Sequence, residues 1–263
     1  MMMRPQISNG RAISLVAGAE LKSFWGGASA GLAVAVFLGL SGFFFYNGVA
    51  DYVMGALLAA SKGRALDASI SLFSQGLTYI SLVMMLVAPL VTMRSLTPAR
   101  RGGRLDFFQT MPLNGPQIIL GQYLSAFLSL AILIILALVP FVVLLAAGVG
   151  SLAVLFTAAA GLLALGSALA ALGLMCSAAS SSPMGAALGA LGLGGLMWVL
   201  GWAAPYLDGL FGDIWSGLAF MPRISRFALG MLDGNDLLFF AVLTVAALLN
   251  AAVLLAARTG GGD

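Results

Sequence analysis

Six stretches of mostly apolar residues, each about as long as a membrane-spanning helix, constrain this chain more than any other feature of its sequence. An α-helix needs about 20 predominantly apolar residues to cross the hydrocarbon core of a bilayer. Within lipid, a helix also pairs the backbone N–H and C=O groups that water cannot reach. The stretches cover residues 26–46, 72–93, 118–145, 152–178, 184–204 and 237–257. The sequence therefore predicts an all-α integral membrane protein with six transmembrane helices, forming a single domain over residues 1–263.

The composition agrees with lipid as the solvent of this chain. Apolar residues make up 61% of the 263 residues and charged residues only 8%, whereas about 25% of a soluble domain is charged. The 34 glycines and 9 prolines would destabilise a helical bundle in water. Membrane helices tolerate them because neighbouring helices pair the backbone groups that such residues leave free.

Several chemistries are excluded by the residues that the sequence lacks. It contains no histidine, which excludes His-ligated zinc and nucleophiles activated by histidine. Its positive charges are scattered around apolar stretches and form no dense basic patch, so we expect no nucleic-acid partner. We predict no catalytic residue and no metal site. The single cysteine, Cys176, lies in an apolar stretch and is predicted to be a small buried packing residue.

The distribution of charged residues predicts the orientation in the membrane. With six spans and a cytoplasmic N-terminus, the inner segments hold Arg4, Arg11, Lys22, Arg94, Arg100, Arg101, Arg104 and Arg258. The outer segments hold Lys62, Arg64, Arg223 and Arg226 together with Asp51, Asp67, Asp208, Asp213, Asp233 and Asp236. Because Lys and Arg are enriched in cytoplasmic loops, this distribution favours both termini inside.

Two segments outside the spans have unusual patterns. Residues 1–25 mix apolar residues with Arg11, Glu20 and Lys22, which is typical of a helix that lies along the membrane surface. Residues 205–236 mix aromatic residues with glycines and acids. This segment is too apolar for a solvated loop and too interrupted to span, so we expect re-entrant or interfacial helices on the outer side.

The connection over residues 94–117 concentrates polar residues in a chain that otherwise avoids them. Thr97 and Pro98 are suited to the start of a helix. The basic residues Arg100, Arg101 and Arg104 are followed by the apolar residues Leu105, Phe107 and Phe108. The pattern predicts a short amphipathic cytoplasmic element. From these residues alone it could dock on a protein partner, or its arginines could set topology and bind lipid headgroups.

The order and spacing of this connection resemble the signature region of type-2 ABC export permeases, in particular the gliding-motility and nitrous-oxide-reductase-maturation branch. That pattern runs P-L-x-T-M-R, R-R-x-G-T-L-E-L-L, T-x-P and I-x-x-G-K-[FY]. Its counterparts here are residues 89–94, 100–108, 110–112 and 118–123. Residues 19–24 resemble the family's lead into the first span, and residues 226–236 resemble its F-x-R-G-x-[IL]-D-x-x-D lead into the last.

The sequence departs from the family pattern at four positions. Pro98 and Ala99 stand where the family has two acids, Arg104 stands for a threonine, and Gln122 stands for the lysine of the last motif.

The resemblance implies a transporter subunit that is driven by a separate ATPase. It implies the type-2 ABC exporter permease fold in a bacterial cytoplasmic (inner) membrane, with residues 94–117 acting as a coupling helix seated on an ABC ATPase subunit. The residues implied to couple to that ATPase are Arg100, Arg101, Gly103, Leu105, Asp106 and Phe107. Since the chain has no G-x-x-x-x-G-K-[ST] phosphate loop, it is not itself an enzyme. ATP and Mg would bind to two ATPase copies.

The resemblance also implies further partners. A second permease subunit would complete the transporter, either a homodimer partner or a related permease. Membrane lipids surround the spans. The complex could also perform mechanical work on an extracytoplasmic partner protein, because its coupling apparatus would look the same as that of an exporter. The substrate stays open.

Two other classes of membrane protein fit less well. Secondary transporters driven by ion gradients keep ionisable residues inside the membrane, whereas none lies centrally in the six predicted spans. Intramembrane transferases need clustered acids. Asp233 and Asp236 are the closest pair, and we interpret them as a helix cap or loop anchor.

Overall fold

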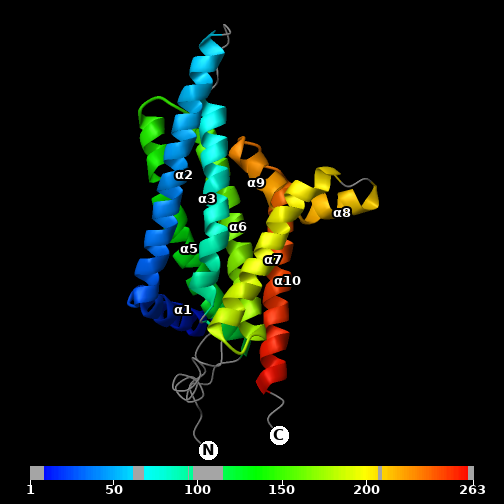
Figure 1. The fold of residues 1–263 in the computed structure, drawn as a ribbon. Coiled ribbons are helices and arrows are strands. Elements are labelled where there is room, and N and C mark those ends of the chain that lie inside the picture. The colour runs from blue at the N-terminus through cyan, green and yellow to red at the C-terminus, as the bar shows by residue number, and fades with distance from the viewer. Residues whose placement is uncertain (1–8, 62–67, 94, 97–114, 207–208, 260–263) are drawn as a thin grey trace, which may run out of the picture.

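The computed structural model describes residues 9–61, 68–93, 95–96, 115–206 and 209–259 (Figure 1). These residues form helices and their connections, without a strand. Within them, six helices are long and apolar enough to cross a membrane. They are α2 (Ala28–Ser61), α3 (Ala68–Thr92), α5 (Gly115–Ala146), α6 (Leu152–Ala179), α7 (Pro183–Ala203) and α10 (Gly234–Thr259). The prediction of an all-α, multi-pass membrane protein is confirmed.

The remaining described helices are short or lie outside the bundle axis. They are α1 (Asn9–Trp25), the 3₁₀ turn η2 (Ala204–Tyr206), α8 (Leu210–Leu218) and α9 (Met221–Ala228). Helix α1 lies across one end of the bundle, where α3 and α10 end and α5 begins (Figure 1). We call this the α1 end. Helices α8 and α9 lie toward the opposite, far end, where α8 points away from the bundle (Figure 1).

Helix α2 differs most from its predicted bounds. We expected it to end at residue 46, but it continues to Ser61, so Asp51 lies on a helix rather than in a loop. Residues 49–61 are mostly Ala, Leu, Val and Met and contain no proline, so the helix is not interrupted. A helix of 34 residues is about 51 Å long, whereas the hydrocarbon core is about 30 Å thick. The end of α2 rises above the rest of the bundle (Figure 1).

The other long helices begin and end within a few residues of the predicted spans. The largest of these differences is at α3, which begins at Ala68 instead of residue 72. Helix α5 begins at Gly115 instead of residue 118. Pro116 occupies its first turn, where a missing N–H has no cost. This proline is therefore compatible with the earlier start of α5.

Helix α6 is the centre of the bundle and contacts α3, α5, α7, α9 and α10. It is apolar on all sides, as expected for a buried helix. Two of its glycines permit close packing. A Cβ on Gly173 would overlap Thr92 of α3, and one on Gly161 would lie 2.6 Å from the Cγ atom of Phe227 of α9.

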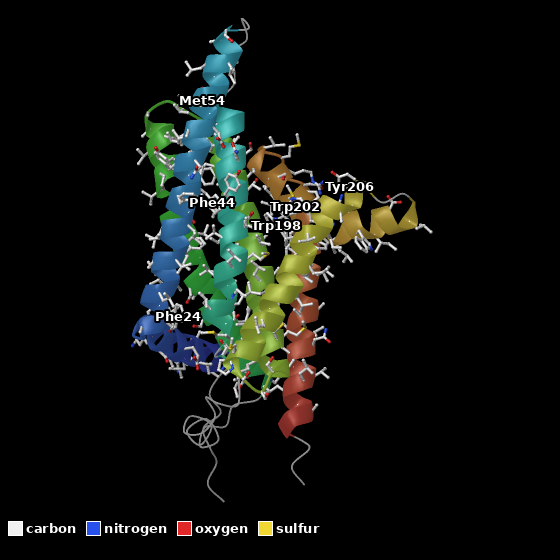
Figure 2. The ribbon with its side chains drawn as sticks, in the orientation of Figure 1. Phe24, Phe44, Met54, Trp198, Trp202 and Tyr206 are labelled. Carbon is white, nitrogen blue, oxygen red and sulfur yellow. The ribbon has the colours of Figure 1, made fainter. Side chains whose placement is uncertain are left out.

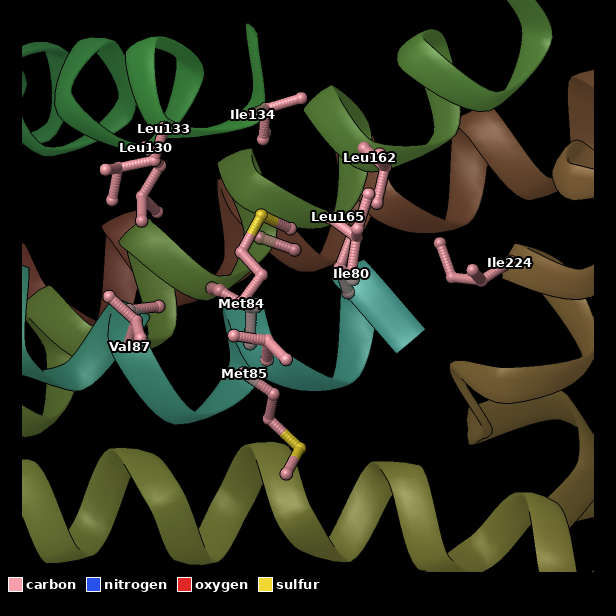
Figure 3. Close-up of a cluster of buried hydrophobic side chains, with 14 of the residues drawn as sticks. Ile80, Met84, Met85, Val87, Leu130, Leu133, Ile134, Leu162, Leu165 and Ile224 are labelled. Carbon is pink, nitrogen blue, oxygen red and sulfur yellow. The ribbon is translucent and has the colours of Figure 1, made fainter. Parts of the chain in front are cut away.

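Methionines on α3 fill the space between α3 and its neighbours (Figure 3). Met84 is fully buried and approaches Gly166 of α6, and Met85 extends toward Gly194 of α7. Cys176 of α6 is 6% exposed and packs against Gly189 of α7. The prediction that this cysteine is a buried packing residue is confirmed.

Candidate functional site

The residues implied to couple to an ATPase lie outside the described part of the chain. They are Arg100, Arg101, Gly103, Leu105, Asp106 and Phe107. The structure does describe the chain on both sides of them. We call Ser95 and Leu96, which follow α3, the first root of the connection, and residues 115–123, which begin α5, the second root.

The first root is fastened to α6. The backbone N–H of Leu96 donates a buried hydrogen bond to Ser177 Oγ at 2.9 Å. The Leu96 side chain is 5% exposed and packs with Leu174 and Ala178 of α6 and with Ala251 of α10. Both polar and apolar contacts therefore fix this root to the end of the central helix.

Gln122 connects the two roots. Its Nε2 atom donates a hydrogen bond to the backbone oxygen of Ser95 at 2.8 Å, and its side chain is 6% exposed. Gln122 stands where the family pattern has a lysine. A lysine could donate to the same oxygen, so the hydrogen bond gives this position a physical role that either residue can fill.

Helix α1 packs on the second root. A Cβ on Gly121 would lie 2.6 Å from the Val16 side chain and 3.2 Å from the backbone oxygen of Ile13, so only glycine allows this approach. Beyond that contact, Gln117 Nε2 donates to Asn9 Oδ1 at 2.8 Å. Helix α1, the two roots and the end of α6 thus form one connected assembly, which we call the root platform.

The far end carries a buried ionic cluster. Asp236, in the first turn of α10, is fully buried. It accepts hydrogen bonds from Arg223 Nη1 at 2.6 Å and from Arg226 Nε at 2.7 Å, and a further one from Arg226 Nη2. The guanidinium of Arg223 also donates to the Gly217 oxygen and lies 3.9 Å from the centre of the Phe239 ring. The cluster ties α8, α9 and α10 together.

The geometry of this cluster follows from helix periodicity. Arg223 and Arg226 are three residues apart and therefore lie on one face of α9. Hydrogen bonding to Asp236 raises the pKa of the Arg226 guanidinium above its usual value. Asp233 Oδ1 accepts from the backbone N–H of Asn235 at 3.0 Å, which caps the start of α10. These are the contacts of a loop anchor and a helix cap, the two roles that we predicted for the acids.

The described residues show no cluster of three or more His, Cys, Asp or Glu side chains that could hold a metal ion. At the far end, Asp236 is instead paired with Arg223 and Arg226. Their arrangement holds helices in place and offers no open coordination position within the described chain.

Sequence reasoning missed the residues that build the root platform. In the sequence, Ser177 and Gln122 are single polar residues near the ends of apolar stretches. Such residues indicate only weakly that a buried hydrogen-bond partner exists. The packing of Gly121 on Val16 had no signal beyond the glycine of the family motif. Arg223 and Arg226 were interpreted only as outer charges, although their spacing and the nearby acid indicated an ion pair.

No protein-family model matches this chain, and no curated protein sequence matches it.

Proposed function

We propose that this chain is the membrane-spanning permease subunit of an ABC transporter. It couples ATP hydrolysis by a separate ATPase subunit to the export or extraction of a substrate. The proposal rests on the resemblance of residues 89–123, 19–24 and 226–236 to type-2 ABC export permeases, on the six long apolar helices, and on the structure of the root platform.

The observation that supports it best is how firmly both roots are held. Leu96 is bonded to Ser177 of α6, and Gln122 of α5 is bonded to Ser95. Through these bonds a displacement of residues 97–114 reaches α3, α5 and α6 together. A coupling element needs such stiff attachment more than it needs a catalytic group, because it transmits movement and performs no chemistry.

The implied complex contains two permease subunits and two ATPase subunits in a bacterial cytoplasmic membrane. The second permease is a copy of this chain or a related one. ATP and Mg bind on the ATPase. The residues that we propose to contact it are Arg100, Arg101, Gly103, Leu105, Asp106 and Phe107.

A photocrosslinking experiment in native membranes tests this assignment. A photoreactive amino acid replaces Phe107 in the full chain, and in a control it replaces Phe156, which is 68% exposed near the far end. We expect the probe at residue 107 to capture a polypeptide that carries an ATP-binding phosphate loop, and the probe at residue 156 not to do so. Capture of that polypeptide from both positions, or from neither, would contradict the proposal.

One observation favours a complex that works mechanically on an extracytoplasmic partner. Counted at 1.5 Å per residue, Asp51 lies about 35 Å along α2 from Ala28, beyond the thickness of the hydrocarbon core. The residues after it expose large apolar side chains, with Met54 65% and Leu58 64% exposed. Figure 2 shows Met54 in this upper part of α2. An apolar surface beyond the lipid is typical of a protein contact.

An ion-driven secondary transporter is the other alternative. It needs an ionisable residue within the membrane. In the described chain Asp51 lies about 35 Å along α2 from Ala28, and Asp236 is paired with two arginines. Ion-gradient-driven uptake by the purified chain without an ATPase would favour this alternative over the proposal.

A further inference from the structure

A cavity of about 750 Å³ opens at the α1 end of the bundle. It lies between α1, the start of α2, the end of α3 and the starts of α5 and α7. Figure 2 shows Phe24, one of its lining residues, at the corner where α1 meets α2. Its volume is in the range of about 300–1,000 Å³ that small-molecule sites occupy.

One wall of the cavity carries an unsatisfied buried acceptor. Gln122 is 6% exposed, and its Oε1 atom has no hydrogen-bond partner within the described chain. The direction of the amide is fixed, because Nε2 is the atom that donates to the Ser95 carbonyl oxygen. A buried carbonyl oxygen without a donor is rare in folded proteins, and it indicates a missing donor at this wall.

Two serines of α5 line the same cavity as this acceptor. They are Ser125 and Ser129, which are 5% and 1% exposed. The Ser129 hydroxyl donates to the Ser125 backbone oxygen, so its own oxygen remains able to accept. The wall therefore offers several oxygen acceptors to a group that carries more than one donor.

The rest of the lining is mixed: Glu20, Ser23 and Ser29 contribute polar groups near the corner of α1 and α2, and the other side chains are mostly apolar. The apolar ones include Phe24, Leu32, Leu90, Val91 and Ala126. Leu32 is 59% exposed and stands on α2 close to the start of that helix. A cavity with an acceptor-rich wall and apolar sides, at the end of a set of membrane-spanning helices, matches an amphiphile whose head carries donors and whose tail stays in lipid.

We propose that this cavity binds a membrane aminolipid, a phospholipid of the phosphatidylethanolamine class. Its ammonium carries three N–H donors, which can pair with Gln122 Oε1 and with the hydroxyl of Ser125, one turn further along α5. A phosphatidylcholine headgroup has no N–H donor and leaves Oε1 unpaired. Charged donors form stronger hydrogen bonds than hydroxyls do, so ethanolamine is preferred over the glycerol headgroup of phosphatidylglycerol. The site also adjoins Met93 and Ser95, where the chain leaves α3.

Native mass spectrometry of the full chain in detergent tests this proposal. The chain is titrated with dioleoyl phosphatidylethanolamine, phosphatidylcholine and phosphatidylglycerol, and with water-soluble glycerophosphoethanolamine. We expect one tightly held phosphatidylethanolamine, bound about tenfold or more tightly than phosphatidylcholine, because a hydrogen bond from a charged donor has that effect. Equal binding of the two lipids, or tighter binding of phosphatidylglycerol, would overturn the proposal. Equal binding of the soluble headgroup would overturn the assignment to a lipid.

Two variants locate the site. Gln122→Leu should reduce phosphatidylethanolamine binding to the level of phosphatidylcholine. Ser125→Leu fills the cavity and leaves the bond between Gln122 and Ser95 in place, so it should abolish the tightly held lipid. Ser14→Leu makes the same exchange on the exposed face of α1 and should leave binding unchanged. An unchanged preference for phosphatidylethanolamine in Gln122→Leu would overturn the proposal. If either variant fails to fold, the comparison of lipids on the unaltered chain still tests it.

Discussion

Gln122 donates a hydrogen bond to the backbone oxygen of Ser95 at 2.8 Å. Ser95 lies at the start of the 94–117 connection and Gln122 lies in α5, the helix that follows it, so this bond joins the two ends of the connection. The two residues are 27 positions apart in sequence. Their contact means that the connection closes on itself at the bundle, and that its two ends move together.

Replacing Gln122 tests how much this hydrogen bond contributes to the stability of the fold. Gln122→Leu removes the donor and leaves the Ser95 oxygen unpaired, which should cost about 1 kcal/mol of stability. Gln122→Lys restores a donor at the same position and should retain more of that stability. Thermal unfolding of the purified variants in one detergent compares them. Equal midpoints for the two variants would show that the hydrogen bond does not stabilise the fold.

Gly121 should not tolerate a side chain, because its Cβ would lie 2.6 Å from Val16 of α1. Gly121→Ala should destabilise the packing of α1 on α5 by about 1–3 kcal/mol. Gly192→Ala is the matched control, since nothing lies within 4 Å of a Cβ there. Protease accessibility of α1 measures the effect, and the double variant Val16→Ala, Gly121→Ala should recover part of it. Equal loss in the Gly121 and Gly192 variants would contradict the close contact.

Much of the fold follows from the sequence, whereas the precise contacts do not. An apolar stretch of about twenty residues is stable in lipid as a helix, so the six long helices could be predicted. The end of α2 could not, because Asn47 and Asp51 are common loop residues. In the structure Asn47 donates to the Phe43 oxygen, and Asp51 accepts from Gln75 of α3 at 3.4 Å.

The same limit applies to the candidate site. Motif order identified residues 89–123 as important, but it gave no partner for any of them. Ser177 lies 81 residues from Leu96, and a contact at that separation depends on how α3 and α6 pack. Thr92 could not be paired with Gly173 from the sequence for the same reason.

Ser177→Ala should weaken the attachment of the first root. The Leu96 N–H would lose its acceptor, at a cost of about 1–3 kcal/mol for a buried unpaired group. Ser167→Ala is the control on the same helix, because Ser167 bonds instead to Thr244 of α10. If the chain is an ABC permease, the Ser177 variant should also reduce ATPase stimulation more than the Ser167 variant. Equal thermal unfolding of the two variants would argue against a special role for the root.

Asp236→Asn should be among the most damaging single substitutions at the far end. It removes the charge that pairs with Arg223 and Arg226. Breaking a buried pair costs about 3–5 kcal/mol, and we expect the lower end of that range because Arg226 is 41% exposed to water. Asp213→Asn changes an exposed acid of α8 and should have little effect. Thermal unfolding in detergent separates the two, and equal midpoints would contradict the role of the cluster.

Single cysteines can test the predicted orientation in whole cells. With both termini inside, a cysteine at Ser14 of α1 should react with a membrane-impermeant maleimide only after permeabilisation. A cysteine at Ser216 of α8 should react without it. The native Cys176 is 6% exposed and should stay unlabelled in both cases. Labelling of residue 14 in intact cells would reverse the orientation.

The packing of α1 has a consequence for how the protein is made. Helix α1 leaves the ribosome before α5, because Gln117, which bonds to Asn9, follows 108 residues later. At about 5–20 residues per second, α1 waits at least about 5 s for its partner. During that interval its binding surface on α5 does not yet exist. Insertion of α5 then captures α1 and completes the α1 end of the bundle.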